Sequence, residues 1–344
     1  MERLDFALLW LIFFSMIAVG FVAYLVMELG NVNGGLRLFR VLFPPRRQRT
    51  VPWGISAIPL ALAIYVMVML LSHWFVQHVF PGAVDLPHDE NMVALEAAEK
   101  SADSETDAGA TSPVSDEELP DQHSLTILMQ KGGRDPIVIL VCFLTAVIVA
   151  PLTEEFMFRV VFQGGIEASL RREFGHSALA KRISILFTAL FFAASHFRTP
   201  QEITPSSVDR MFQDMTAMVI GNLATMAVVI MVFRRLFHIR RSDIGLWDFR
   251  RIGRDALGAL LLVLVIIFPI HIVNDSVGTL ARSDWAAAHG LSASMGDPIP
   301  LLLFAMVIGT LYHRTRRFAP VFFLHAFFNL YGFLVLMDLT YGRG

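Results

Sequence analysis

The sequence predicts an all-α, polytopic membrane protein with about eight transmembrane helices. Of its 344 residues, 55% are hydrophobic and only 17% are charged, and the mean hydropathy is +0.58. Apolar segments of spanning or nearly spanning length recur along the chain, and arginine-rich loops follow every second one. This composition excludes an ordinary soluble domain. The single cysteine, Cys142, excludes an internal disulfide and offers no thiolate metal site.

Eight segments are expected to cross the membrane: residues 6–26, 55–75, 137–162, 183–197, 215–233, 256–272, 299–311 and 319–339. The first lacks a basic leader and a small-residue cleavage site, so we expect an uncleaved helix. The fourth and seventh are shorter than the roughly 20 residues of a lipid-exposed span, so flanking residues or neighbouring helices should complete them. Basic clusters follow the first, third, fifth and seventh segments, which predicts that both termini lie outside the cytoplasm.

The chain is expected to have three parts. Residues 1–80 hold two transmembrane helices and a basic loop, and residues 136–344 hold the other six helices. Between them lies the linker 81–135, in which residues 85–121 contain twelve acidic residues and one lysine. Such a segment buries little apolar surface, so we expect it to be largely disordered. Its lack of Lys and Arg fits the extracytoplasmic side.

Three ionisable residues lie within the third apolar segment: Glu154, Glu155 and Arg159. A charged side chain at a helix centre in the bilayer costs about 2.5–3.5 kcal/mol or more, so such residues usually face a protein interior and serve a function. Glu155 and Arg159 have the i, i+4 spacing of an ion pair on one helix face. Glu154 is turned about 100° away and lacks a local partner, which makes it a candidate general base. The alternative is a salt bridge with a carboxylate relay, as in a transporter.

Two histidines in other segments could join these carboxylates. Phe192 precedes His196 by four residues and Asn329 follows His325 by four, so each pair lies on one helix face. A carboxylate, the two imidazoles and the Asn329 amide could bind a metal through nitrogen and oxygen, or orient a water and stabilise an oxyanion. A lone intramembrane histidine, by contrast, often only links two helices. The chain contains neither His-Glu-x-x-His nor Gly-x-Ser-x-Gly, which removes the zincin and common serine-hydrolase arrangements.

Taken in order, Glu154-Glu155-x-x-x-Arg159, Phe192-x-x-x-His196 and His325-x-x-x-Asn329 resemble the signature of the CPBP intramembrane protease family. That family includes the Rce1-type CAAX prenyl endopeptidases and bacterial immunity (ABI-type) proteins. The run of residues 309–315 is also similar to the family's penultimate motif. The similarity extends from about residue 137 to about residue 339 and leaves out the first two helices and the linker. It implies an active site between the third, fourth and eighth helices.

The resemblance also implies a role for each residue. Glu154 and His196 would activate the attacking water, and His325 and Asn329 would hold the oxyanion of the tetrahedral intermediate. Three further residues would support the site: Glu155, Arg159 and Phe192. The family has also been interpreted as zinc-dependent, in which case Glu154, His196 and His325 would be the ligands. The spacing of the residues is compatible with both interpretations.

The implied function is an intramembrane endopeptidase that opens toward the cytoplasm. Its substrate would be a membrane-embedded or lipidated peptide or protein, such as a prenylated CaaX protein. The alternative is a non-catalytic immunity or scaffold protein with the same fold, against which the intact site residues argue. A proton-coupled transporter would need broken helices or a repeat, and the sequence shows neither. We expect a protein of the bacterial cytoplasmic membrane, or of the endoplasmic reticulum in a eukaryote, with the bilayer and its substrate as partners and no nucleic acid.

Depth in the membrane sets a condition on this site. At about 1.5 Å per residue, Glu154 and His325 fall in the cytoplasmic half, whereas His196 falls beyond the midplane if its helix begins at Ile183. These residues can meet only if the third helix continues past Phe162 or the fourth enters later, and we expect both. A distance from Glu154 to His196 beyond the reach of one bridging water would rule the site out.

Overall fold

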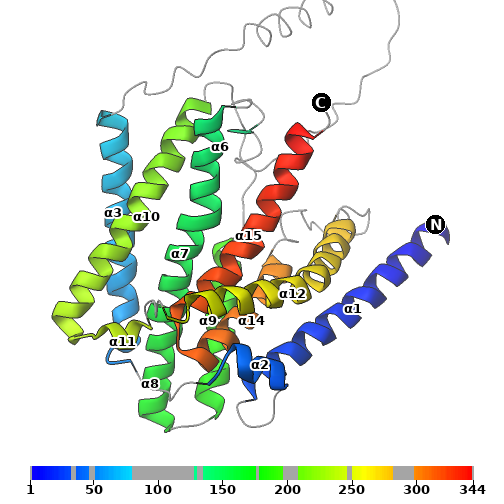
Figure 1. Ribbon diagram of the computed structural model, residues 1–344, viewed down its shortest axis with the longest axis horizontal. Coiled ribbons are helices and arrows are strands. Elements are labelled where there is room, and N and C mark those ends of the chain that lie inside the picture. The colour runs from blue at the N-terminus through cyan, green and yellow to red at the C-terminus, as the bar shows by residue number, and fades with distance from the viewer. Residues whose placement is uncertain are drawn as a thin grey trace, which may run out of the picture.

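The computed structural model describes residues 2–31, 36–45, 51–79, 128–129, 135–175, 178–196, 208–245, 250–281 and 298–342. Every element of secondary structure within these ranges is a helix, and the long helices form a bundle (Figure 1). Seven of the described helices are long and apolar enough to cross a membrane. The predicted fold class is confirmed, and the protein is a multi-pass integral membrane protein. Most of the acidic linker 81–135 lies outside the described residues.

The bundle is built from helices of very different length. The N-terminal part contributes α1 (Glu2–Gly30), the short α2 (Arg37–Leu42) and α3 (Ala57–Val79). A single helical run from Pro136 to Phe174 follows. The remaining helices are α9 (Ala178–Ser195), α10 (Val208–Phe237), α11 (Arg241–Ile244), α12 (Ile252–Ala281), α14 (Pro298–Thr315) and α15 (Phe318–Tyr341). Helices α3, α10 and the long run lie side by side at one edge of the bundle, and α1 lies at the opposite edge (Figure 1).

The long run that carries the two glutamates departs from regular α geometry on both sides of them. Its segments are α6 (Pro136–Phe143), the π-helix η1 (Leu144–Val149), α7 (Ala150–Glu155), the π-helix η2 (Phe156–Gln163) and α8 (Gly164–Phe174). Asp135 begins the helix by accepting a hydrogen bond from the Ile137 amide at 2.7 Å. Pro151 lacks an N–H group and would clash with a carbonyl one turn earlier in a regular α-helix, so a wider turn before it relieves the clash. Such π segments occur frequently at functional sites.

The seventh expected span is not among the seven membrane-crossing helices. It forms α14, in which every residue from Val307 to Thr315 is buried. Helices α1, α9, α12 and α15 all pack against it. A helix enclosed in this way does not need the length and hydropathy of a lipid-exposed span. The expectation that neighbouring helices complete this segment is therefore confirmed.

The two expectations about helix ends have different outcomes. The third span does continue past Phe162, and its helix ends at Phe174. The fourth span does not begin later than Ile183. Its helix α9 begins at Ala178, one and a half turns earlier, and ends directly before His196. The additional residues form the basic end of the span and include Lys181 and Arg182.

The basic loops meet at one end of the bundle. Arg314, at the end of α14, donates hydrogen bonds to three backbone carbonyls: those of Leu29, Asn31 and Phe43, at 2.9, 3.0 and 2.9 Å. The last turn of a helix leaves its carbonyl groups without partners in the helix, so Arg314 supplies hydrogen-bond donors to the carbonyls at the end of α1. The positive-inside rule predicts that this end of the bundle is cytoplasmic.

Candidate active site

The structure brings together the two glutamates and the two histidines singled out in the sequence. Glu154 and Glu155 end α7, His196 directly follows α9, and His325 lies in α15. The Nε2 atoms of His196 and His325 each lie 3.7 Å from the Oε2 atom of Glu154. This distance exceeds a direct hydrogen bond and is within reach of one bridging water. Two imidazoles therefore face a single carboxylate oxygen.

The two sides of this centre differ in exposure. The side chains of Glu154 and His196 are each 27% exposed. Those of His325 and Glu155 are 5% and 0% exposed. The centre is therefore accessible from the side of Glu154 and His196, and protein buries the opposite side.

Each carboxylate oxygen of Glu155 contacts a buried partner. It accepts a hydrogen bond from Arg159 Nε at 3.1 Å, and its other oxygen lies 2.8 Å from Nδ1 of His325. A buried carboxylate that meets a guanidinium on one oxygen binds the Nδ1–H group of the imidazole with the other. This contact fixes the His325 ring with Nε2 turned toward Glu154. Glu155 is therefore paired with Arg159 as predicted, whereas Glu154 faces the two histidines of other helices.

The ring of His196 is oriented by its own helix. Its Nδ1 lies 2.8 Å from the backbone oxygen of Phe192. A carbonyl oxygen only accepts hydrogen bonds, so Nδ1 carries the hydrogen. In the neutral imidazole, Nε2 then presents its lone pair toward Glu154. The i, i+4 spacing of Phe192 and His196 thus places the Phe192 carbonyl where it can orient the His196 ring.

The ring of Phe192 packs against both histidines and Arg159. It is fully buried, and its centroid lies 4.5 Å from that of His196 and 5.8 Å from that of His325. The guanidinium carbon of Arg159 lies 5.5 Å from the same ring centroid, a cation–π contact. One aromatic side chain therefore contacts three of the predicted site residues.

Asn329 makes a contact that its spacing did not indicate. Its Nδ2 donates a hydrogen bond to the backbone oxygen of Ala146 in η1, at 2.8 Å. Within the described part of the chain, no hydrogen bond joins Asn329 to Glu154, His196 or His325. One amide hydrogen and the side-chain oxygen of Asn329 therefore remain for other interactions.

A second group of buried charged residues lies further along the same helix. Glu167 in α8 pairs with Arg171 and Arg316 at 2.5 Å each, and with His313 at 3.3 Å. This group was not predicted from the sequence, although the i, i+4 spacing of Glu167 and Arg171 is a local signal for its first pair. The group joins α8 to α14 at the basic end of the bundle, away from Glu154.

The donor types of Glu154, His196 and His325 suit zinc. Among the residues that the structure describes, however, no group of three or more His, Cys, Asp or Glu side chains is arranged to hold a metal ion. Zinc binding by Glu154, His196 and His325 stays a hypothesis that a chelator tests.

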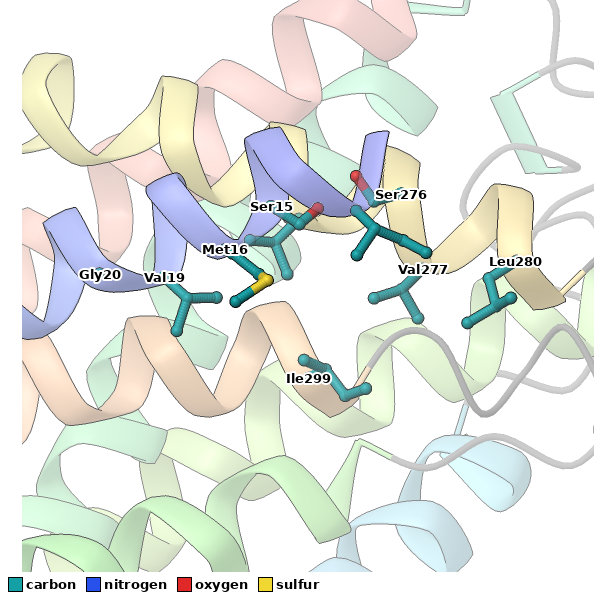
Figure 2. Close-up of a pocket in the computed structure, with 10 residues that line it drawn as sticks. Ser15, Met16, Val19, Gly20, Ser276, Val277, Leu280 and Ile299 are labelled. Atoms are coloured by element: carbon teal, nitrogen blue, oxygen red, sulfur yellow. The ribbon is translucent and has the colours of Figure 1, made fainter. Parts of the chain in front are cut away.

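A separate apolar cavity of about 440 Å³ lies between α1, α12 and α14. Figure 2 shows Met16 and Val19 of α1 opposite Val277 and Leu280 of α12, with Ile299 at the start of α14. None of the predicted catalytic residues lines this cavity. It therefore does not form part of the candidate active site.

The fold and this site together define a class: a polytopic membrane protein with a carboxylate–imidazole centre among its helices. Residues 136–331, more than half of the chain, match the family model of type II CAAX prenyl endopeptidase Rce1-like proteins. The chain belongs to this family and is accordingly an intramembrane protease that acts on a peptide substrate. No curated protein and no solved structure matched the chain. The matched segment includes all the predicted site residues and leaves out α1, α2 and α3.

Proposed function

We propose that the protein hydrolyses a peptide bond in a membrane-associated substrate with a water activated by Glu154 and His196. The observation that best supports this is the approach of two imidazole Nε2 atoms to one oxygen of Glu154, each at 3.7 Å. The Glu154 and His196 side chains are also the exposed members of the group. A positioned base of this kind contributes about 10²- to 10⁴-fold to a reaction rate.

In the proposed first step, the water donates one hydrogen bond to Glu154 and the other to Nε2 of His196. Glu154 takes the proton as the water oxygen adds to the carbonyl carbon of the scissile bond. The product is a tetrahedral intermediate with a negative oxygen. When the carbon–nitrogen bond breaks, Glu154 returns the proton to the leaving amine, so the carboxylate is regenerated.

The oxyanion would be stabilised from the buried side of the site. In the proposed state, His325 carries hydrogens on both ring nitrogens, and Glu155 binds the Nδ1–H group. The Nε2–H group then donates to the oxyanion. Asn329 would supply a second donor through the amide hydrogen that Ala146 does not use. Donors held in place before the reaction stabilise such an oxyanion without reorganisation.

Family membership supports a prenylated CaaX peptide as the first substrate to test. The purified protein would be incubated with a quenched fluorescent farnesylated CaaX peptide and with the same peptide lacking the farnesyl group. We expect the farnesylated peptide to be cleaved at least about 10-fold faster, because the lipid places it at the membrane. Equal rates would contradict a requirement for the lipid. No cleavage of either peptide would contradict a CaaX substrate.

The same assay tests the metal alternative. The proposed mechanism has no metal step, so a chelator is expected to leave the rate unchanged. A loss of cleavage that added zinc restores would contradict this mechanism and would make Glu154, His196 and His325 metal ligands.

A further inference from the structure

We propose that Gln163 is a positioning residue that holds Arg159 in place through its side-chain oxygen. Arg159 in turn fixes Glu155, which orients His325. Gln163 ends η2 and lies one helical turn beyond Arg159. The inference rests on the proposed function, because it concerns how the proposed catalytic groups are held in position.

The geometry around Gly309 connects the two side chains. Gln163 is fully buried, and its Nε2 donates a hydrogen bond to the backbone oxygen of Gly309 at 2.9 Å. A Cβ atom built on Gly309 would lie 3.2 Å from the Oε1 atom of Gln163 and 3.5 Å from the Nη1 atom of Arg159. The amide oxygen and the guanidinium nitrogen therefore flank the same point, and the absence of a side chain at Gly309 leaves room for both.

The hydrogen-bonding capacity of the two groups is complementary. Among the described residues, Oε1 of Gln163 has no hydrogen-bond partner, and neither do Nη1 and Nη2 of Arg159. Leaving a buried donor or acceptor unpaired is unfavourable, so an acceptor and a donor that lie within 3.5 Å of one point are expected to pair through one water. Arg159 uses only Nε to bind Glu155.

The guanidinium would then be held at three points: the carboxylate of Glu155, the ring of Phe192 and the amide oxygen of Gln163. Without Gln163, the Arg159 guanidinium can rotate about the hydrogen bond that its Nε donates to the Glu155 carboxylate. Glu155 would lose its fixed position against Nδ1 of His325, where the contact is 2.8 Å. Displacement of a catalytic group by about 1 Å can cost on the order of 10²-fold in rate.

Two substitutions separate positioning from simple packing. Gln163→Met has a similar size but no hydrogen-bonding groups. Gln163→Glu keeps an acceptor oxygen for Arg159 and removes the donor to Gly309. We expect Gln163→Met to lower kcat by about 10- to 100-fold with KM unchanged, and Gln163→Glu to keep most of the wild-type kcat. Ser276→Ala, which removes a hydrogen bond to the Ile272 oxygen in α12, is the control and should not change kcat.

An equal loss of kcat in Gln163→Met and Gln163→Glu would overturn the proposal and leave Gln163 as a link between η2 and α14. A second test does not depend on activity. Thermal unfolding of Gln163→Met, Arg159→Met and the double variant should show a smaller fall in Tm for the double variant than the two single falls together. Additive falls would overturn the proposal even if the wild type is active. A wild type that cleaves no peptide would contradict the proposed function, and the Tm comparison would still decide the role of Gln163.

Discussion

Glu154 and Glu155 are adjacent in the chain and lie in opposite environments. Glu155 is fully buried between a guanidinium and an imidazole, whereas the side chain of Glu154 is 27% exposed. The rotation of about 100° per residue in a helix produces this difference. One carboxylate is therefore held between two buried partners, and the other is partly exposed.

The buried ring of Phe192 is expected to support both the stability of the protein and its activity. Phe192→Ala removes a side chain that contacts His196, His325 and Arg159. We expect it to lower the free energy of unfolding by about 3–5 kcal/mol and to lower kcat as well. Unfolding in detergent would be compared with that of Phe191→Ala. Phe191 is 43% exposed and should lose much less stability. Equal losses in both variants would contradict the role of Phe192 as a buried support.

At the scale of elements, the helix that carries the glutamates is held by close backbone packing. Its segment α8 begins with Gly164 and Gly165, and the backbone oxygen of Gly54 lies directly against the second of these. Next to it, Trp53 donates a hydrogen bond from Nε1 to the Val161 oxygen at 3.3 Å. The segment before α3 thus packs on the helix that carries the glutamates, where no side chain separates the two backbones.

Gly165→Ala tests this contact. A Cβ atom at this position would lie 2.9 Å from the Gly54 oxygen, closer than van der Waals contact allows. We expect a loss of about 1–3 kcal/mol in the free energy of unfolding. Gly332→Ala, in the interior of α15 with no atom within 4 Å of the new Cβ, is the control. It should be neutral or stabilising by up to about 1 kcal/mol. A neutral Gly165→Ala would show that the two backbones do not pack this closely.

Hydropathy predicted a helix at each of the eight expected segments because it is a local property of the chain, although α14 is not among the seven helices that could cross a membrane. The positions of Glu155 and Arg159 on one face also followed from local spacing. Long-range contacts could not be predicted in this way. The partner of Gln163 lies 146 residues away at Gly309, and the partner of Asn329 lies 183 residues away at Ala146. The π segments on either side of the glutamates likewise had no sequence signal beyond Pro151.

At the scale of the whole molecule, the N-terminal helices and the family segment form one bundle. Helix α1 packs on α12 and α14, and α3 packs on α10, although the family match begins only at residue 136. Arg314 ties the two parts together through three backbone carbonyls and is itself 1% exposed. The N-terminal part therefore contributes to the stability of the segment that carries the site.

Arg314→Met is expected to destabilise the whole bundle, because it leaves the carbonyls of Leu29, Asn31 and Phe43 without their donor. The expected loss is about 1–3 kcal/mol for each carbonyl that finds no other partner. Thermal unfolding in detergent measures it, with Arg235→Met as the control, since Arg235 is exposed on α10. A variant as stable as this control would contradict the view that Arg314 joins the two parts.

The proposed mechanism depends on Glu154 as the base that activates water. The most direct measurement compares kcat for peptide cleavage by the wild type, Glu154→Gln and Glu173→Gln, a control at an exposed glutamate of α8. We expect a loss of about 10²- to 10⁴-fold in kcat for Glu154→Gln, with unchanged Tm, and wild-type activity for Glu173→Gln. A Glu154→Gln variant that is folded and cleaves the peptide at the wild-type rate would contradict this role of Glu154.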